Sequence, residues 1–320
     1  MKMTVLGLAV VAAAGVARGD YFMTAGAPVK VATGTSGSNY TNTEGPIYDG
    51  NGHVLFGELN HLHANDLIWS YDIASGQPTI VVTSSGGTEG DYFNPTGGLV
   101  TADRDTRQVS LRSTSNLSTV VSVLASSFGG KQFNGPNDLV VDSTGGVFFT
   151  DPNFEGFSNR QPQDAVYYIT PGGTVNQVLT EGTAAPNGIM LSPDQKTLYV
   201  GLWASNVVDA FDLNTAGVPT NERQFAAPTQ PDGMTVDAWG NLIVARQGGV
   251  SGYSPSGVKL FDVSIPEANF NASNVELVGN SLYVTAGISL YRVPLTQVPE
   301  ASTVGMLGVG VAALMRRRRK

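Results

Sequence analysis

The sequence has no cysteine, only three histidines and few charged residues, which make up 14% of the 320-residue chain. Without cysteine the protein has no disulfides and no thiolate metal site. The low charge, and the lack of a long helical periodicity between the two ends of the chain, argue against long solvated helices. The formal net charge is −8 and no basic stripe precedes the C-terminal cations, so we expect no binding to nucleic acid.

Glycine and proline are abundant instead, with 39 and 17 residues, which is typical of many short strands joined by tight turns. Residues 20–297 are long for one ordinary domain but of normal length for an all-β closed ring. A ring of this size buries enough surface to be stable without disulfides. We therefore expect one all-β domain over residues 20–297. We also expect the protein to be a monomer.

The first 19 residues have the pattern of a secretory signal peptide. Lys2 precedes an apolar run at residues 6–14, and the small residues Ala17 and Gly19 suit a cleavage site. The alternative for residues 1–19 is a buried N-terminal helix. We favour the signal peptide, so that the mature protein begins near Asp20.

Residues 298–320 form a separate segment with three parts: Val298-Pro299-Glu300, an apolar stretch at 304–315 and five cations at 316–320. The apolar stretch is short for a membrane span, which needs about 20 residues. The order of the parts resembles the PEP-type C-terminal sorting signal of exported bacterial proteins, with Ala301 in place of the usual second proline. The alternative is an ordinary tail anchor.

The resemblance to a sorting signal implies a location and a partner. The location is the periplasm, the cell surface or the extracellular matrix, with a transient anchor in the inner membrane. The partner is a sorting protease, an exosortase, at the C-terminus. Membrane contact is then confined to the terminal segments.

Four short strings share one layout: Glu44-Gly45-Pro46, Pro136-Asn137-Asp138, Pro186-Asn187-Gly188 and Pro231-Asp232-Gly233. The last three each lead into an apolar strand, a turn and a second strand, and they recur after 50 and 45 residues. A repeat of this period built from short strands is typical of propeller blades. Six such blades account for residues 20–297, so we predict a six-bladed β-propeller.

The repeat also predicts a metal site in a central tunnel. Radial repetition directs equivalent positions toward one axis, so four side chains should converge: Glu44, Asn137, Asn187 and Asp232. Two carboxylates and two amides suit a hard divalent cation, first of all Ca²⁺, with Mg²⁺, Mn²⁺ or Zn²⁺ as alternatives. Any one of these strings taken alone is a common turn opener.

The blades can be placed roughly along the chain. The first begins at Glu44, the second covers about residues 97–124, and the next three open at residues 134, 186 and 231. The sixth runs over about 274–293. The span 84–98 is rich in Gly, Ser and Thr, so we expect a loop there that covers one mouth of the tunnel.

These motifs resemble the senescence-marker-protein/gluconolactonase/luciferin-regenerating-enzyme family of six-bladed propellers. Beside the four strings, the matching pieces include Phe149-Thr150-Asp151-Pro152, Ser192-Pro193-Asp194 and Leu282-Tyr283-Val284-Thr285. Members of the family bind a divalent cation, usually calcium, in the tunnel and typically hydrolyse lactones or related esters. By motif position, the resemblance assigns metal ligation to Glu44, Asn137, Asn187 and Asp232.

The expected chemistry is metal-assisted hydrolysis. A cation polarises a lactone carbonyl and stabilises the charge that develops on its oxygen. Asp232 is the expected catalytic residue, which activates a water or attacks the carbonyl directly. A neighbouring cation keeps its pKa low enough for ionisation.

The chain departs from the family pattern where substrate contacts are expected. The second-blade string Glu-His-Gly-Asn-Arg-Arg is replaced by Asp-Arg-Asp-Thr-Arg-Gln at 103–108. Asp103, Arg104 and Arg107 are therefore candidates for binding a hydroxylated or anionic substrate, and exposed rim arginines are the alternative. In the first blade Gly57-Glu58 replaces a Ser-Asp pair. In the fourth blade Trp203 offers a flat face to a sugar ring or packs in the core.

Two smaller groups leave alternatives open. Asp151, which precedes a proline, is either a tunnel carboxylate or the cap of a strand end. The three histidines, His53, His61 and His63, lack a third soft ligand, so we expect a loop between strands there rather than a zinc site.

Two function classes follow from the sequence. The first is an exported, divalent-metal-dependent hydrolase of a small lactone or related ester, similar to gluconolactonase. The second is a non-catalytic surface propeller that keeps its metal for stability and binds a ligand or extracellular polysaccharide. Asp232 favours the first class, and the altered second blade favours the second.

Overall fold

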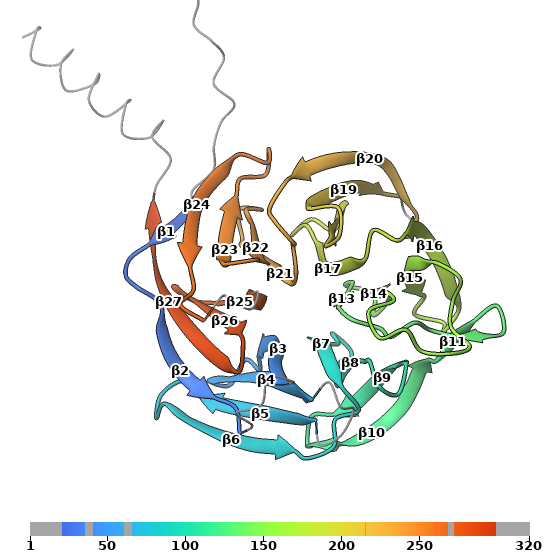
Figure 1. Ribbon diagram of the computed structural model, residues 1–320, viewed down its shortest axis with the longest axis horizontal. Coiled ribbons are helices and arrows are strands. Elements are labelled where there is room, and N and C mark those ends of the chain that lie inside the picture. The colour runs from blue at the N-terminus through green and yellow to red at the C-terminus, as the bar shows by residue number, and fades with distance from the viewer. Residues whose placement is uncertain (1–20, 36–40, 61–65, 215, 268–271, 299–320) are drawn as a thin grey trace, which may run out of the picture.

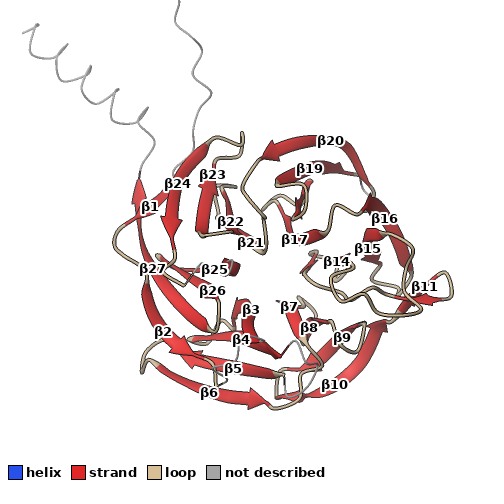
Figure 2. Ribbon diagram, in the orientation of Figure 1, coloured by secondary structure: helices blue, strands red, loops and turns tan. Residues whose placement is uncertain are grey.

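The computed structural model describes residues 21–35, 41–60, 66–214, 216–267 and 272–298. Across these ranges the regular elements are all β-strands (Figure 2). The predicted all-β class is thus confirmed. The described ranges contain no helix with the length and apolar character needed to cross a membrane. The predicted signal peptide, most of the predicted sorting segment, His61 and His63 lie outside the described residues.

The strands form six sheets around a common axis, which confirms the six-bladed propeller (Figure 1). Blade 1 contains β3 (Thr41–Tyr48), β4 (His53–Asn60), β5 (Leu67–Asp72) and β6 (Gln77–Val82). Blade 2 contains β7 (Thr88–Phe93), β8 (Leu99–Asp103), β9 (Gln108–Ser113) and β10 (Asn116–Ala125). A short hairpin of β11 (Ser127–Phe128) and β12 (Lys131–Gln132) follows it.

The remaining blades follow the same order from the axis outward. Blade 3 contains β13 (Leu139–Val141), β14 (Val147–Asp151), β15 (Asp164–Ile169) and β16 (Val175–Gly182). Blade 4 contains β17 (Pro186–Leu191), β18 (Thr197–Leu202), β19 (Val207–Leu213) and β20 (Pro219–Ala226). Blade 5 contains β21 (Met234–Val236), β22 (Leu242–Arg246), β23 (Gly249–Tyr253) and β24 (Lys259–Ser264).

Blade 6 joins the two ends of the described chain. Its inner strands are β25 (Ala272–Val278), β26 (Ser281–Ala286) and β27 (Ser289–Val298), and its outer edge comes from β1 (Tyr21–Thr24) and β2 (Val29–Thr33). Both N-terminal strands pair antiparallel with β27, so hydrogen bonds between the first and last strands close the ring. This pairing fixes the first and last strands of the described chain in one blade, and a propeller leaves only short, protected sheet edges.

The hydrophobic core lies between neighbouring blades rather than at the centre of the molecule. Each of the apolar clusters found among the described residues joins one pair of adjacent blades, and together the clusters cover all six interfaces. Because each sheet is packed on both faces, strands such as β14 are buried along their whole length. This packing explains the continuous apolar runs, such as Val147-Phe148-Phe149, that the sequence shows in the second strand of a blade.

The prediction for blade 2 was wrong at its beginning. The span 84–98, which we expected to be a loop over the tunnel mouth, contains β7, the innermost strand of that blade. Its residues include Glu89, Gly90 and Asp91, so it lacks the apolar pattern of a strand. The inner strands of other blades, such as β13, are apolar and packed between blades, so β7 departs from them in its own residues.

Candidate active site

Five polar residues occupy equivalent positions at the beginning of the inner strands, and we call them the axial ring: Glu44, Glu89, Asn137, Asn187 and Asp232. Glu44, Glu89 and Asn187 lie within β3, β7 and β17, and the other two lie two residues before β13 and β21. These inner strands are the ones nearest the centre in Figure 1. The structure therefore brings the four predicted ligands to one place and adds Glu89.

Hydrogen bonds link neighbouring members of the axial ring. The Asn137 amide donates to Oε2 of Glu89 in the adjacent blade, and the Asn187 side chain lies beside Asp232 and lowers the pKa of that carboxyl. Glu44 accepts a hydrogen bond from Asn42 Nδ2 at 3.0 Å. Each contact except the last crosses a boundary between blades, so the ring depends on how the blades pack.

Glycine next to the ring residues makes this close approach geometrically feasible. A Cβ atom at position 188 would lie 2.8 Å from the carbonyl carbon of Asp232 and nearer still to its oxygen. A Cβ at position 45 would collide in the same way with the carbonyl oxygen of Glu89. Glu44, Asn187 and Asp232 are each followed by glycine. At positions 45 and 188 the neighbouring inner strand occupies the space that a side chain would need.

The carboxylates of the axial ring are buried and lie close enough to repel one another. Burial raises the pKa of Glu44 and of Asp232 well above the usual carboxyl range. The charge of Asp232 raises the pKa of Glu44 further, and the charge of Glu89 raises both. Burial also raises the pKa of Glu89 to about 7, against the opposing effect of the Arg104 guanidinium. A cation on the axis would relieve this repulsion.

Sequence reasoning missed Glu89, although a signal was present. Glu89-Gly90 repeats Glu44-Gly45 after 45 residues, the same interval that separates Asn187 from Asp232. The missing proline and the surrounding Gly-, Ser- and Thr-rich stretch concealed the match.

Of the three expected substrate-binding residues, only Arg104 has a described contact with the axial ring. Its Nη1 lies 3.1 Å from Glu89 Oε1 and 3.7 Å from Glu155 Oε1, and its Nε donates to Asp105 at 2.7 Å. The side chain is almost completely buried, so it is not the exposed rim arginine of the alternative interpretation. Arg104 places one positive charge beside the carboxylates of the ring.

Asp103 and Arg107 make their described contacts within the protein framework. Asp103 is buried beside Arg112, at 3.4 Å, and accepts a hydrogen bond from Thr88 Oγ1 at 2.9 Å. Arg107 donates to the carbonyl oxygens of Phe133 and Ser158 at 2.6 and 2.9 Å, which ties the β11–β12 region to the loop after β14. Their role in substrate binding stays a prediction.

The other candidates have contacts that indicate structural roles. The buried Asp151 carboxylate accepts hydrogen bonds from the backbone N–H groups of Asn134 and Gly135, each at 2.8 Å, and so caps the loop that leads to Asn137. His53 Nδ1 lies 2.9 Å from Asp49 Oδ2. Trp203, at the end of β18, packs edge-on against the exposed Phe154 with ring centroids 5.9 Å apart.

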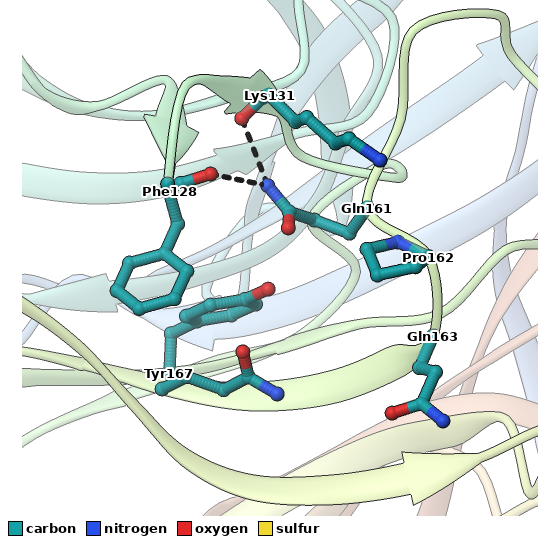
Figure 3. A pocket seen from close by; sticks show the side chains of 8 residues that line it. Phe128, Lys131, Gln161, Pro162, Gln163 and Tyr167 are labelled. Atoms are coloured by element: carbon teal, nitrogen blue, oxygen red, sulfur yellow. Dashed lines mark hydrogen bonds between the residues drawn. The ribbon is translucent and has the colours of Figure 1, made fainter.

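A pocket of about 310 Å³ lies at the β11–β12 hairpin and is lined by none of the axial-ring residues. Figure 3 shows Gln161 donating to the carbonyl oxygens of Phe128 and Lys131, at 2.9 and 2.8 Å, with Tyr167 beside them. The described residues that line this pocket include no carboxylate. It therefore lacks the chemistry for metal-assisted hydrolysis.

The axial ring fits a hard cation by its chemistry, although its side chains are not arranged as a finished metal site. The described residues contain no group of three or more Asp, Glu, His or Cys side chains placed to hold a metal. The ring mixes carboxylates with amides, and the Asn137 amide is directed at Glu89 through its nitrogen. Presenting its oxygen instead requires rotation of the amide, after which all five side chains offer oxygen donors.

Comparison with known proteins identifies the family of the chain. The family model of the SMP-30/gluconolactonase/LRE-like region matches residues 42–288. A gluconolactonase from Zymomonas mobilis is 30% identical over 227 residues, which cover 65% of this chain and 63% of that enzyme. The match thus spans less than two thirds of the relative's own length. A PEP-CTERM protein-sorting motif matches residues 297–320, which indicates export toward the cell envelope or surface.

Two solved structures support the fold. A gluconolactonase from Xanthomonas campestris aligns with a TM-score of 0.72 at 24% identity, over 84% of this chain and 89% of that chain. A calcium-binding protein, regucalcin, from Agrobacterium tumefaciens aligns with a TM-score of 0.65 at 19% identity, over 84% and 96%. The resemblance noted from the sequence motifs is confirmed. The chain belongs to the SMP-30/gluconolactonase/LRE-like family of β-propellers and carries a C-terminal PEP-CTERM sorting motif.

Proposed function

We propose that the protein is an exported hydrolase of a small lactone or related ester, and that it depends on a divalent cation, most simply Ca²⁺. The observation that supports this most directly is the axial ring, where carboxylates and amides from five blades meet. The gluconolactonase relative supports the substrate class. The calcium-binding structural neighbour supports the choice of metal.

The proposed ligands are Glu44, Asn137, Asn187 and Asp232, with Glu89 beside them. When bound, a divalent cation supplies Lewis-acid polarisation of the lactone carbonyl. Asp232 acts as the base: as a water oxygen bonds to the carbonyl carbon, the water proton passes to the Asp232 carboxylate. The ring C–O bond then breaks, and the departing oxygen takes the proton back from Asp232, which gives the hydroxy acid and restores the Asp232 carboxylate.

Arg104 has a positioning role in this proposal. Its guanidinium is held between Glu89 and Glu155, so its charge is fixed at the ring rather than free to move. From this place it favours a substrate that carries hydroxyl or carboxylate oxygens.

The proposal includes a location and partners. The protein acts in the periplasm, at the cell surface or in the extracellular matrix, and an exosortase-type protease recognises its C-terminal segment. It works as a monomer, with the lactone or ester as its small-molecule partner and no nucleic acid. We propose that residues 1–19 are removed on export and that residues 20–297 form the functional propeller.

One observation favours the second function class, a metal-stabilised binding propeller without turnover. Asp103 and Arg107, which stand where relatives of this family contact substrate, make hydrogen bonds inside the protein instead. If catalysis is lost for this reason, the metal remains as a structural element that stabilises the fold by linkage.

Hydrolysis of a lactone panel across a calcium titration separates the two classes. Asp232→Asn is expected to stay slower than wild type by about 10²–10⁴-fold even at saturating calcium, because the positioned base is lost. Glu44→Gln should weaken calcium affinity, so that excess calcium restores much of its activity. The matched control is Asp209→Asn, because Asp209 in β19 is as buried as Asp232, with 7% and 8% of their surfaces exposed. Equal turnover by wild type and Asp232→Asn at saturating calcium would refute the assignment.

A further inference from the structure

A groove of about 390 Å³ lies between blades 4 and 5 and has a lining rich in rings. Its walls come from the turns that follow the inner strands β17 and β21, from the turn between β23 and β24, and from the outer strand β20. No axial-ring residue lines it, because the ring lies at the other end of the inner strands. The ring-bearing residues of the groove are Pro193, Tyr199, Phe225, Trp239 and Pro255.

Contacts between these rings hold the groove open in the folded chain. Tyr199 and Phe225 pack edge-to-face with their centroids 4.9 Å apart. Gly240 lies between the two exposed prolines, since a Cβ atom there would be 3.5 Å from Pro255 Cγ and 4.0 Å from Pro193 Cδ. Preformed grooves lined by aromatic side chains are typical docking surfaces for extended, proline-containing segments.

The last described residues of the chain lie beside one end of this groove. Trp239 packs edge-on against Phe22 of β1, with ring centroids 5.3 Å apart. Phe22 in turn pairs with Gln297 of β27, and β1 lies beside β24 of blade 5 (Figure 1). The chain that continues after Val298 therefore starts one strand pairing and one ring contact away from Trp239.

The residues that follow Val298 match the groove in length and chemistry. They are Pro299-Glu300-Ala301-Ser302-Thr303, the beginning of the sorting segment. Five extended residues span about 17 Å, so they can reach Trp239 and continue along the groove. Pro299 has a fixed φ and loses little conformational freedom when it packs against aromatic rings.

The charges of the groove and of the segment are complementary. Glu300 is the one charged residue among positions 299–303. Arg223 lines the groove with 48% of its side chain exposed, and its Nη1 donates to Asp212 Oδ1 at 2.7 Å. A guanidinium has five N–H donors, so Arg223 can bind a second carboxylate without releasing Asp212. Asp194, the acidic residue of the lining, is itself paired with Lys196 at 3.8 Å.

We propose that this groove is an intramolecular docking site for residues 299–303 of the sorting segment. Pro299 packs against Trp239, and Glu300 pairs with Arg223. The short tether gives the segment an effective concentration on the order of millimolar, so that even weak contacts keep the groove occupied. The propeller then presents the beginning of the sorting motif in one extended conformation, and recognition of the motif depends on the folded state of blades 4 and 5.

Pairs of engineered cysteines test this docking in the full chain, which has no cysteine of its own. Ala238→Cys with Ala301→Cys joins the groove to the segment, because Ala238 is exposed and lines the groove. Met23→Cys with Ala301→Cys is the matched control. Met23 is 43% exposed, lies within two residues of the end of β27 by register, and projects from the opposite face of β1 to Phe22.

The full-length protein in detergent is allowed to form disulfides in a thiol–disulfide buffer. The 238–301 pair should form its intramolecular disulfide about 10-fold faster than the 23–301 pair, because docking raises the effective concentration of one thiol at the other. Adding Glu300→Gln should slow the 238–301 pair and leave the control pair unchanged.

Equal rates for the two pairs would overturn the docking, because an undocked segment reaches Met23 at least as easily as Ala238. Disulfides between two chains, separated by gel electrophoresis, would assign the groove to the segment of a second copy and would also overturn the intramolecular contact. Neither substrate nor metal enters the measurement, so its outcome is independent of the proposed hydrolase activity.

Discussion

Replacing Gly188 with alanine tests whether the contact between blades 4 and 5 positions Asp232. The added Cβ would lie 2.8 Å from the Asp232 carbonyl carbon and 3.0 Å from Gly233 Cα, where ordinary contacts begin at 3.4 Å. All of these neighbours are backbone atoms, so no side chain can turn aside. Lengthening the contact with the carbonyl carbon from 2.8 to 3.4 Å moves the Asp232 backbone by about 0.6 Å. The contact with the carbonyl oxygen is shorter, so it requires a larger displacement.

Two consequences follow from this displacement. Overpacking of this kind costs about 1–3 kcal/mol in the free energy of unfolding. A misplacement of about 1 Å at a reacting group costs about 100-fold in rate, so a shift of 0.6 Å or more should lower kcat/KM by about 10-fold or more. Calcium affinity should fall as well, because Asp232 is one of the proposed ligands.

The assays are urea unfolding, calorimetric calcium titration and lactone hydrolysis, the last two at temperatures where the variant is fully folded. Gly172→Ala is the matched control, because Gly172 lies in the exposed turn between β15 and β16. A Cβ there would have its nearest neighbour, Thr170 Oγ1, at 3.8 Å. A Gly188→Ala variant with wild-type calcium affinity and kcat/KM would refute the view that this inter-blade contact sets the geometry of the axial ring.

Two further predictions concern the ring and its support. Asp151→Asn should lower the free energy of unfolding by about 1–3 kcal/mol in urea, because the N–H groups of Asn134 and Gly135 donate to different carboxylate oxygens and an amide replaces one of these oxygens with NH₂; an unchanged value would contradict the capping role. The calcium-free protein should lose thermal stability as the pH rises from about 5 through 7. The reason is that the carboxyls of Glu44, Asp232 and Glu89 have raised pKa values in the fold, and a raised pKa stabilises the protein only while the group stays protonated. Calcium binds the ionised carboxylates, so the addition of calcium should raise the Tm of the protein more at pH 8 than at pH 5. Equal increases at both pH values would count against the ring as the metal site.

The sequence by itself was sufficient for the all-β class and the six blades. The reason is local: each blade repeats a turn and an apolar strand pair, and the strings around Asn137, Asn187 and Asp232 mark the inner strands at regular intervals. Where a blade lacks this pattern, prediction failed. In β7 the inner strand carries Glu89, Gly90 and Asp91 where β13 has an apolar run, so residues 84–98 resembled a loop and Glu89 was missed.

Tertiary structure alone decided which polar side chains meet. Arg104 and Arg107 lie three residues apart in one turn, yet the first contacts Glu89 on the axis and the second holds the loops around Phe133 and Ser158. Asp91 and Glu276 are 185 residues apart in the chain (from 91 to 276), and both line one small cavity. Such proximities depend on ring closure, in which β1 and β2 pair with β27 and so set the spacing of all six blades around the axis. A spacing set by the whole ring cannot be read from any local pattern of residues.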